Sequence, residues 1–367
     1  MNAKRQAAPT TTSARPPRVR DFSRRAGSVE VSWDVRTVYD FVFSLSEESG
    51  TTDDLPAPDR LWLRSSRSSL WAAIGEAPLA LYGSEFCIVL AGLAVDRPEV
   101  QDAASFVALV READRTTILR TILSQGDETP EQRAMLDRAV EGDLDAVRQR
   151  LEVLLATHEP EERERIGRLF DDPDAVIAAA RDVLAAWLPY FAAVEPRVRG
   201  MLERDARGRE RDARGLPPTE LVERTTGGIR WLSEPGVSRV ILAPSYFARP
   251  YNFLLGGTDW RLFAYPIADS ALDVGDPLAP PPGVLRLHRA LGDETRLRIL
   301  RLLREQDLYL TEIATALELS KPTIKHHLAQ LRAAGLVTVT EEGGLTYYSL
   351  RRERLDDVGP ELTSYLR

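Results

Sequence analysis

The strongest constraint on the fold is a pair of helices with almost nothing between them, predicted between Leu310 and Gly335. Apolar residues recur three and four positions apart over Leu310–Leu317, which is the pattern of a helix with one buried stripe. A turn of only three residues follows, and its last residue, Ser320, is a favourable N-cap for a second helix over Lys321–Ala334. Gly335 suits the left-handed conformation that ends many helices. Two helices joined this closely predict a helix-turn-helix.

The elements around this pair extend the prediction to a winged helix. Two more helices are expected before it, near Val284–Leu291 and over Thr295–Arg304, and two strands are expected after Gly335. This order is that of a winged helix-turn-helix, placed here at residues 284–367. Beyond the strands, four more apolar residues recur at helical spacing: Leu355, Val358, Leu362 and Tyr365. They either help two copies of the chain to dimerise or cover their own domain, and both interpretations stay open.

The second helix of the pair has the charge expected of a helix that reads DNA. No acidic residue occurs from Ser320 to Leu336, and two of the three lysines of the chain, Lys321 and Lys325, lie on this helix. Successive residues turn by about 100° around a helix axis, so the apolar side chains gather on one side and polar side chains face away. An α-helix fits the major groove of DNA. The sequence therefore predicts that this outer face binds double-stranded DNA.

Eight residues at the start and on the polar sides of this helix are the candidate DNA contacts: Ser320, Lys321, Pro322, Thr323, Lys325, His326, Gln330 and Arg332. Lys321 and Arg332 flank the apolar stripe and are expected to contact phosphates. Lys325 and His326 point outward and are expected to reach base edges. His327 lies beside the apolar stripe and is predicted to be a hydrogen-bonded structural residue. Because adjacent helical residues diverge by about 100°, the two histidines cannot chelate one ion, and neither a metal nor a cofactor is expected.

Three stretches carry a resemblance to a known family: ALGDETRLRILRLL, LTEIATALELSKPTIKHHLAQLRAAGLV and a wing that ends in YYSL. They resemble the ArsR-type winged-helix repressors, over about a fifth to a quarter of the chain. The resemblance implies a homodimer on an inverted-repeat operator, with the second helix of each pair in successive major grooves. The layout is also similar to longer members of this family that have a long N-terminal domain of unknown function.

Two departures from the family pattern bear on function. Metal-sensing members have a Cys-Val-Cys pattern at the start of the first helix of the pair, where this chain has Tyr309, Leu310 and Thr311. Metal sensing is therefore not expected. The wing tip reads Glu341-Glu342-Gly343-Gly344, where related proteins often have arginine. Because carboxylates repel phosphates, the wing is expected to contribute little to DNA affinity.

The whole chain is expected to be mainly α with some β structure (α+β). Residues 1–27 lack apolar periodicity and are rich in proline, threonine, serine and arginine, which predicts a disordered basic tail. Residues 28–275 are predicted to form a large, mostly helical sensor or dimerisation domain with a small β element near residues 237–267. Residues 276–283 are rich in proline and predict a linker before the winged helix. Pro189 is expected to bend or break a long helix of the large domain.

Charge and cysteine content bound the class and the compartment. The net charge is −8, yet residues 284–367 carry 13 basic and 12 acidic residues, so the acidity belongs to the rest of the chain and leaves a local basic face free to bind DNA. The longest apolar run, Phe86–Val95, is too short to cross a membrane, and no membrane is expected as a partner. The single cysteine, Cys87, cannot form an internal disulfide and is expected to be a core thiol, which favours the cytoplasm.

The sequence contains none of three common catalytic signatures, namely a phosphate loop ending in Lys-Ser/Thr, Gly-x-Ser-x-Gly and His-Glu-x-x-His. We therefore expect a transcriptional regulator, with repression favoured, and not an enzyme. An enzyme with an appended winged helix, or a protein-interaction module, is the alternative. The large domain could sense a small non-metal effector. Eight aromatic residues could line its pocket or, more simply, pack its core: Trp33, Tyr39, Trp62, Trp71, Tyr82, Tyr246, Phe247 and Tyr251.

Overall fold

The computed structural model describes the following residues: 29–46, 49–50, 54–75, 86–124, 126, 128–156, 160–213, 215–273, 278–342 and 345–367. The predicted tail at residues 1–27, the start of the predicted linker and the wing glycines at residues 343–344 lie outside the described residues. We call residues 29–273 the body and residues 278–367 the winged helix.

The body contains these elements in chain order: β1 (Glu30–Trp33), α1 (Val38–Phe43), α2 (Ala57–Ile74), α4 (Phe86–Val89), η1 (Leu90–Ala94), α5 (Ala103–Glu112), α6 (Arg115–Leu123), α7 (Pro130–Glu141), α8 (Leu144–Leu154), α9 (Pro160–Leu169), α10 (Pro173–Ala192), α11 (Glu195–Asp212), α12 (Pro218–Thr226), β2 (Ile229–Arg230), β3 (Arg239–Ser245), β4 (Phe253–Gly256), β5 (Trp260–Pro266) and η2 (Asp269–Ala271). The winged helix contains α13 (Pro282–Leu291), α14 (Glu294–Leu303), β6 (Leu308–Tyr309), α15 (Leu310–Leu317), α16 (Lys321–Ala333), β7 (Val337–Glu342), β8 (Leu345–Leu350), α17 (Arg352–Asp356) and α18 (Val358–Tyr365). The chain is thus mainly α with some β structure, as predicted.

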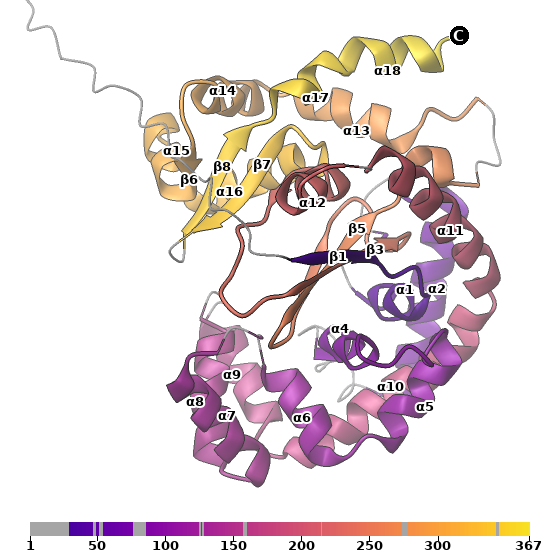
Figure 1. Ribbon diagram of the computed structural model, residues 1–367, viewed down its shortest axis with the longest axis vertical. Coiled ribbons are helices and arrows are strands. Elements are labelled where there is room, and N and C mark those ends of the chain that lie inside the picture. The colour runs from indigo at the N-terminus through magenta and orange to yellow at the C-terminus, as the bar shows by residue number, and fades with distance from the viewer. Residues whose placement is uncertain are drawn as a thin grey trace, which may run out of the picture.

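A four-stranded sheet runs through the body in the order β1-β3-β5-β4 (Figure 1). Strands β1, β3 and β5 are parallel, whereas β4 pairs antiparallel with β5. The β element predicted near residues 237–267 is present as β3, β4 and β5. The mostly helical prediction for residues 28–275 placed β structure only near residues 237–267 and did not anticipate β1 at Glu30–Trp33. Its partner β3 lies far later in the chain, so the local apolar period carries no sign of the pairing.

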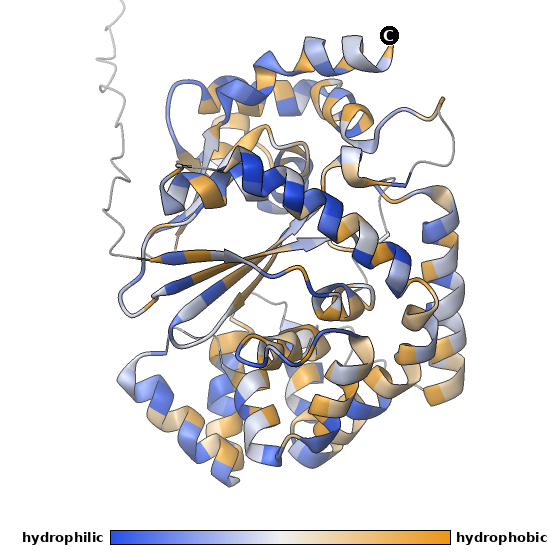
Figure 2. Ribbon diagram, turned by 45° about the vertical axis from the view of Figure 1, so that its right-hand side comes forward, coloured by the Kyte–Doolittle hydropathy of each residue, from blue (hydrophilic) through white to orange (hydrophobic). Residues whose placement is uncertain are grey.

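Both faces of this sheet are covered. Along β3, alternate residues point to opposite sides: Ile241 and Ala243 join the large helical core, whereas Val240 and Leu242 join a smaller core under α12. Figure 2 shows the apolar residues of the body concentrated on the strands and on the inner sides of the helices. The prediction that Cys87 is a core thiol is confirmed, because its side chain is buried and burial raises its pKa to about 12.

Helix α10 lies in the large core, where Trp187 and Phe191 are fully buried. The helix is long and apolar enough to span a membrane by length and composition alone. It packs against α2 and α5, which is the setting of a core helix in a folded domain. Of the bend or break predicted at Pro189, the break is wrong, because α10 continues to Ala192. Packing on both sides of the proline holds the helix together despite the lost backbone hydrogen bond.

The predicted winged helix is confirmed. Helices α13 to α16 occur in the expected order, and β7 and β8 form an antiparallel hairpin. These elements share their own apolar core, which includes Ile313 and Leu331. The structure adds a short strand, β6, that pairs with β8. Helix α13 already begins at Pro282, so the end of the predicted linker is helical, because proline is favoured in the first turn of a helix.

Strand β2 joins the body to the winged helix in a second four-stranded sheet of order β2-β7-β8-β6. Ile229 and Arg230 pair in parallel with Val339 and Thr340 of β7. The backbone N–H of Val339 also donates to the carbonyl of Gly228 at 2.7 Å. The edge of the wing sheet is therefore completed by the body, a contact that the predicted division at residues 276–283 did not anticipate. A strand of two residues leaves no periodic pattern by which sequence could reveal it.

Side chains reinforce this docking. Arg286 of α13 forms an ion pair with Asp54 of the body. The backbone N–H of Gly283 donates to Asp269 at 2.7 Å, and the hydroxyl of Thr338 donates to Glu223 of α12 at 3.2 Å. The winged helix is thus held to the body at α13 and at β7.

Candidate nucleic-acid interface

Helix α16 begins where the sequence predicts. The hydroxyl of Ser320 accepts a hydrogen bond from the backbone N–H of Thr323 at 3.3 Å, which caps the helix. The preceding turn is tight: Glu318 has φ 56°, the only positive φ of a non-glycine residue among the described residues. Ile324, Leu328 and Leu331 are buried in the core of the winged helix. The core thus fixes which side of α16 faces outward.

Six of the eight candidate residues lie together at the solvent-exposed start of α16: Ser320, Lys321, Pro322, Thr323, Lys325 and His326. We call this surface the recognition face. It contains two lysines and no acid. Hydrogen-bonding groups of Ser320, Thr323 and His326 lie beside the ammonium groups, so the surface offers both cations for phosphates and donors for base edges.

Gln330 is half-buried and engaged. Its side-chain oxygen accepts a hydrogen bond from the guanidinium of Arg296, and its amide nitrogen lies 2.7 Å from Nε2 of His326. Gln330 therefore positions His326 at the edge of the recognition face. The buried Arg296 also donates to the carbonyls of Ala290, at 2.8 Å, and Arg289, at 2.7 Å. Arg296 could not be identified from the sequence, because its burial and its partners depend on the packing of α13, α14 and α16 against one another.

Arg332 does not belong to the recognition face. It lies three helical turns beyond Lys321, which is about 16 Å along the axis. Its side chain is half-buried and lines a cleft between the winged helix and the body. The acidic wing residues Glu341 and Glu342 line the same cleft. The structure therefore places the predicted phosphate contact and the predicted unfavourable wing on one surface, away from the start of α16.

His327 packs beside the apolar stripe, as predicted. Its Nδ1 lies 3.6 Å from a carboxylate oxygen of Asp293, the N-cap of α14. No hydrogen bond to this Nδ1 occurs among the described residues, so the hydrogen bond predicted for His327 is not found at this atom. The pKa of Asp293 is lowered, mainly because its carboxylate accepts a hydrogen bond from the backbone N–H of Arg296. Electrostatic interactions with Arg296 and His327 lower this pKa further. His327 therefore faces inward and takes no part in the recognition face.

The aromatic residues proposed for an effector pocket of the body are mostly core. Tyr39, Tyr246 and Phe247 are fully buried, and Phe247 packs against Trp62 with ring centroids 5.8 Å apart. Tyr82 lies outside the described residues. Core packing is therefore the correct explanation for the three buried rings.

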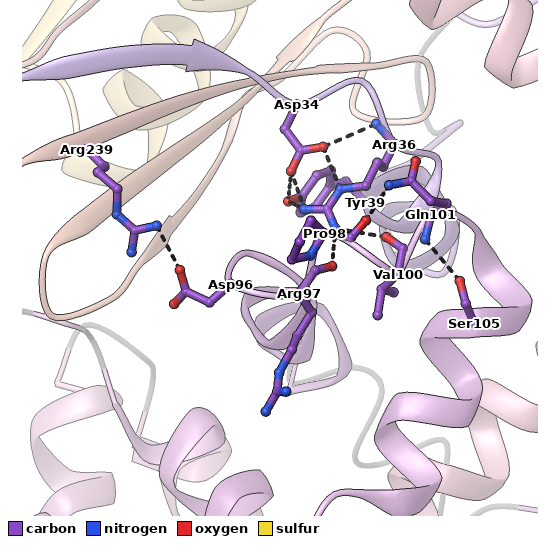
Figure 3. A network of polar contacts seen from close by, with 10 residues as sticks. All are labelled: Asp34, Arg36, Tyr39, Asp96, Arg97, Pro98, Val100, Gln101, Ser105 and Arg239. Carbon is purple, nitrogen blue, oxygen red and sulfur yellow. Dashed lines mark hydrogen bonds and ion pairs between the residues drawn. The ribbon is translucent and has the colours of Figure 1, made fainter.

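Trp33 lines a smaller cleft of about 440 Å³ beside the end of β1. Figure 3 shows the polar contacts of this region, with Arg36 and Asp34 among the residues drawn. The charged groups of Arg36 and Asp34 satisfy each other there. Arg36 donates to Asp34 at 2.8 Å, and to the carbonyls of Arg97 and Val100, also at 2.8 Å. This arginine clamps the loop before α5 onto β1 and has a structural role.

Comparison with known proteins places the similarity in the winged helix. A family model described as "Bacterial regulatory protein, arsR family" matches residues 293–339. The arsenic resistance transcriptional regulator ArsR1 of Pseudomonas putida is 45% identical over 74 residues, which cover 20% of this chain and 56% of that protein. The transcriptional repressor SdpR of Bacillus subtilis is 39% identical over 69 residues, covering 19% and 77%.

Among solved structures, HlyU from Vibrio cholerae is 31% identical and matches 23% of this chain and 94% of that chain, with a TM-score of 0.19. An uncharacterised HTH-type regulator of Methanocaldococcus jannaschii is 37% identical over 73 residues, covering 20% of this chain and 82% of that protein. The chain spans only 56% of the length of ArsR1 and 63% of the length of a cadmium resistance regulator of Staphylococcus aureus.

Proposed function

Because the chain belongs to the arsR family of bacterial regulatory proteins, we propose that it is a transcriptional repressor that binds an inverted-repeat operator as a homodimer. Family membership establishes the coarser function, a DNA-binding transcriptional regulator whose DNA-binding part is the winged helix. The curated relatives include a transcriptional repressor and a transcriptional activator. Repression is therefore the direction that we propose and that a reporter gene tests.

The recognition face carries this proposal. Its six exposed residues include no acid and lie at the capped start of α16. In a helix-turn-helix, the second helix of the pair, here α16, is the one that enters the major groove. Lys325 and His326 face outward next to Thr323, which suits base edges. Lys321 at the rim suits a phosphate.

The homodimer is supported by apolar residues of α17 and α18 that the winged helix leaves uncovered. Leu355, Leu362 and Tyr365 are each more than one third exposed, and Leu366 is 72% exposed. Val358 packs inward on the core of the winged helix, and the hydroxyl of Tyr365 donates to the carbonyl of Leu278. The segment thus covers its own domain with one side and leaves the other side for a second copy. A twofold dimer matches the symmetry of an inverted repeat.

Regulation by a small non-metal effector bound to the body is part of the proposal, as is a cytoplasmic location. The absence of enzymatic activity stays a prediction.

Genome-wide mapping of bound DNA, followed by titration of the mapped fragments with the full chain, tests the proposal. We expect an inverted repeat with half-site centres about 10 base pairs, or a multiple, apart. Affinity should fall steeply with salt, because phosphate contacts release counterions. A reporter under the mapped promoter should rise when the gene is deleted. Sequence-independent binding would contradict the operator, and a failure to bind DNA together with capture of a partner chain would favour the interaction module.

A further inference from the structure

A cleft of about 970 Å³ lies between the body and the wing hairpin, β7 and β8. On the body side it is lined by α6, by the segment after β2 and by the β4–β5 hairpin. On the other side it is lined by Val339, Glu341 and Glu342 of β7 and by Arg332 of α16. The cleft therefore spans the two parts of the molecule, and its volume is at the upper end of the range for drug-sized ligands.

The body wall combines apolar and polar residues and is firmly packed. Ile122, Leu155 and Trp260 are buried within it, and Leu254, which is 51% exposed, lines the cleft. Gly257 lies so close to the indole of Trp260 that an added Cβ would be 2.2 Å from the ring. Such tight contacts hold the wall in place, so the exposed apolar surface stays available to a ligand rather than collapsing inward.

Charges in the cleft are divided unevenly. On the body wall each guanidinium has an acidic partner: Arg120 pairs with Asp137 at 2.8 Å, Arg230 with Glu223 at 2.9 Å, and Arg261 with Glu234. The wing wall is different. Within the described part of the chain, the side chains of Arg332, Glu341 and Glu342 line the cleft without a hydrogen bond or an ion pair. This wall thus has one unpaired cation and two unpaired anions, which leaves an excess of negative charge facing a body wall whose charges are paired and on which Leu254 is exposed.

We infer that this cleft binds an organic cation with an apolar or aromatic body, whose charge lies against Glu341 and Glu342 and whose body packs on the exposed Leu254 and the half-buried Leu154. The two wing carboxylates, which DNA binding leaves without a role, then bind the charge of a ligand. The effect of this ligand on regulation rests on the proposed function.

A ligand in this cleft is coupled to the recognition face through short connections. The wing wall includes Arg332, which lies on the same helix as Lys321 and Lys325. Strand β7 is held to the body by the pairing of Ile229 with Val339. A molecule that bridges the two walls therefore changes the position of the wing and α16 relative to the body. By thermodynamic reciprocity, the ligand and DNA must then alter each other's affinity by the same factor.

Tetraphenylphosphonium and tetraphenylborate test the charge assignment, because they have nearly the same shape and opposite charge. Calorimetric titration of the full chain without DNA is expected to give at least tenfold tighter binding of the phosphonium. The E341Q/E342Q variant should weaken phosphonium binding at least fivefold. The E203Q/E210Q variant, with the same loss of charge on exposed positions of α11, should not. Equal binding of the two ions, tighter binding of the borate, or no binding of either overturns the inference.

A second titration separates this inference from the proposed function. Saturating tetraphenylphosphonium should change the operator affinity of the native chain at least threefold, and E341Q/E342Q should remove that change. If the phosphonium binds as expected while no operator is bound, the proposed function is contradicted and the ligand site in the cleft is supported. If the operator is bound and the phosphonium leaves its affinity unchanged, the regulatory coupling is overturned.

Discussion

Lys325 is the single side chain on which the proposed DNA contact depends most. It is exposed on the outward side of α16, with no acid on the recognition face to compete for its charge. Lys325→Ala should weaken operator binding by about 1–3 kcal/mol per subunit, measured by fluorescence anisotropy. Arg207→Ala, an equal loss of charge at an exposed position of α11, should leave the affinity unchanged. A Lys325→Ala protein with native affinity and native salt dependence would mean that α16 is not the reading helix.

Arg296 is expected to matter for stability and, through Gln330, for DNA binding. It is buried, and its guanidinium satisfies the carbonyls of Ala290 and Arg289 at the end of α13 as well as Gln330 of α16. Arg296→Ala leaves the carbonyl of Ala290 and the side-chain oxygen of Gln330 without this donor, while the carbonyl of Arg289 keeps a hydrogen bond from the N–H of Gly292. The change should lower the free energy of unfolding by about 2–4 kcal/mol in urea titrations. Arg298→Ala, at an exposed position of the same helix, should change it by less than about 0.5 kcal/mol. Similar losses of unfolding free energy in the two variants would contradict this role of Arg296.

Asp40 gives the body a defined pH dependence. Its carboxyl is fully buried, and this burial raises its pKa to about 6, although hydrogen bonds from Phe247, Ser245 and Tyr246 oppose the shift. The folded protein thus binds this proton more tightly than the unfolded chain, whose pKa is about 4. The stability that the proton confers is present below pH 4 and is lost as pH rises through 6.

Relative to Asp40→Asn, which does not titrate, the native protein should lose about 3 kcal/mol of unfolding free energy between pH 4 and pH 7. Urea titrations of both proteins across this range measure the difference. A gap that stays constant with pH would show that Asp40 has an ordinary pKa.

At the scale of elements, the pairing of β2 with β7 depends on one glycine. Gly228 has φ +132°, and a Cβ at this position would be 2.7 Å from the carbonyl oxygen of Val337. Gly228→Ala should therefore separate β2 from β7 and speed hydrogen exchange of the Val339 amide, which donates to Gly228. Gly236→Ala is the matched control, because Gly236 also has a positive φ, +89°, but no atom lies within 4 Å of the added Cβ. Faster exchange in both variants would indicate general strain rather than lost pairing.

The elements also show where sequence was sufficient and where it was not. Helices α15 and α16 could be predicted almost to the residue, because the apolar period, the N-cap Ser320 and the terminal Gly335 agree. Strands β1 and β2 could not, because each is short and gains its stability from a partner strand distant in the chain.

The candidate site divides in the same way. The recognition face follows from the rotation of residues around a single helix, so sequence was enough for its six exposed members. Arg332 lies on the correct side of that helix but too far along it, against a wall supplied by the body. Glu341 and Glu342 were recognised as unusual for a wing. Their place in a cleft depends on the docking of β7 against β2, which no local pattern encodes.

For the whole molecule, the decisive question is assembly, because a single winged helix reads only half of an inverted repeat. Leu362 is 36% exposed on α18, beside Leu366 and Tyr365, and a dimer would bury this surface. Leu362→Glu places a charge there, and burying an unpaired charge is costly. The variant should be monomeric by light scattering at micromolar concentration, whereas the native chain should be a dimer.

Loss of the dimer should also weaken operator binding at least a hundredfold, because each half-site must then be bound without the gain from linking two winged helices. Leu61→Glu on α2 is the control: it places the same charge on a leucine that is 61% exposed, far from α18 in the chain, and should change neither mass nor affinity. If Leu362→Glu remains dimeric with native operator affinity, the copies meet through another surface. A native chain that is monomeric when bound to one half-site would instead remove the inverted repeat from the proposal.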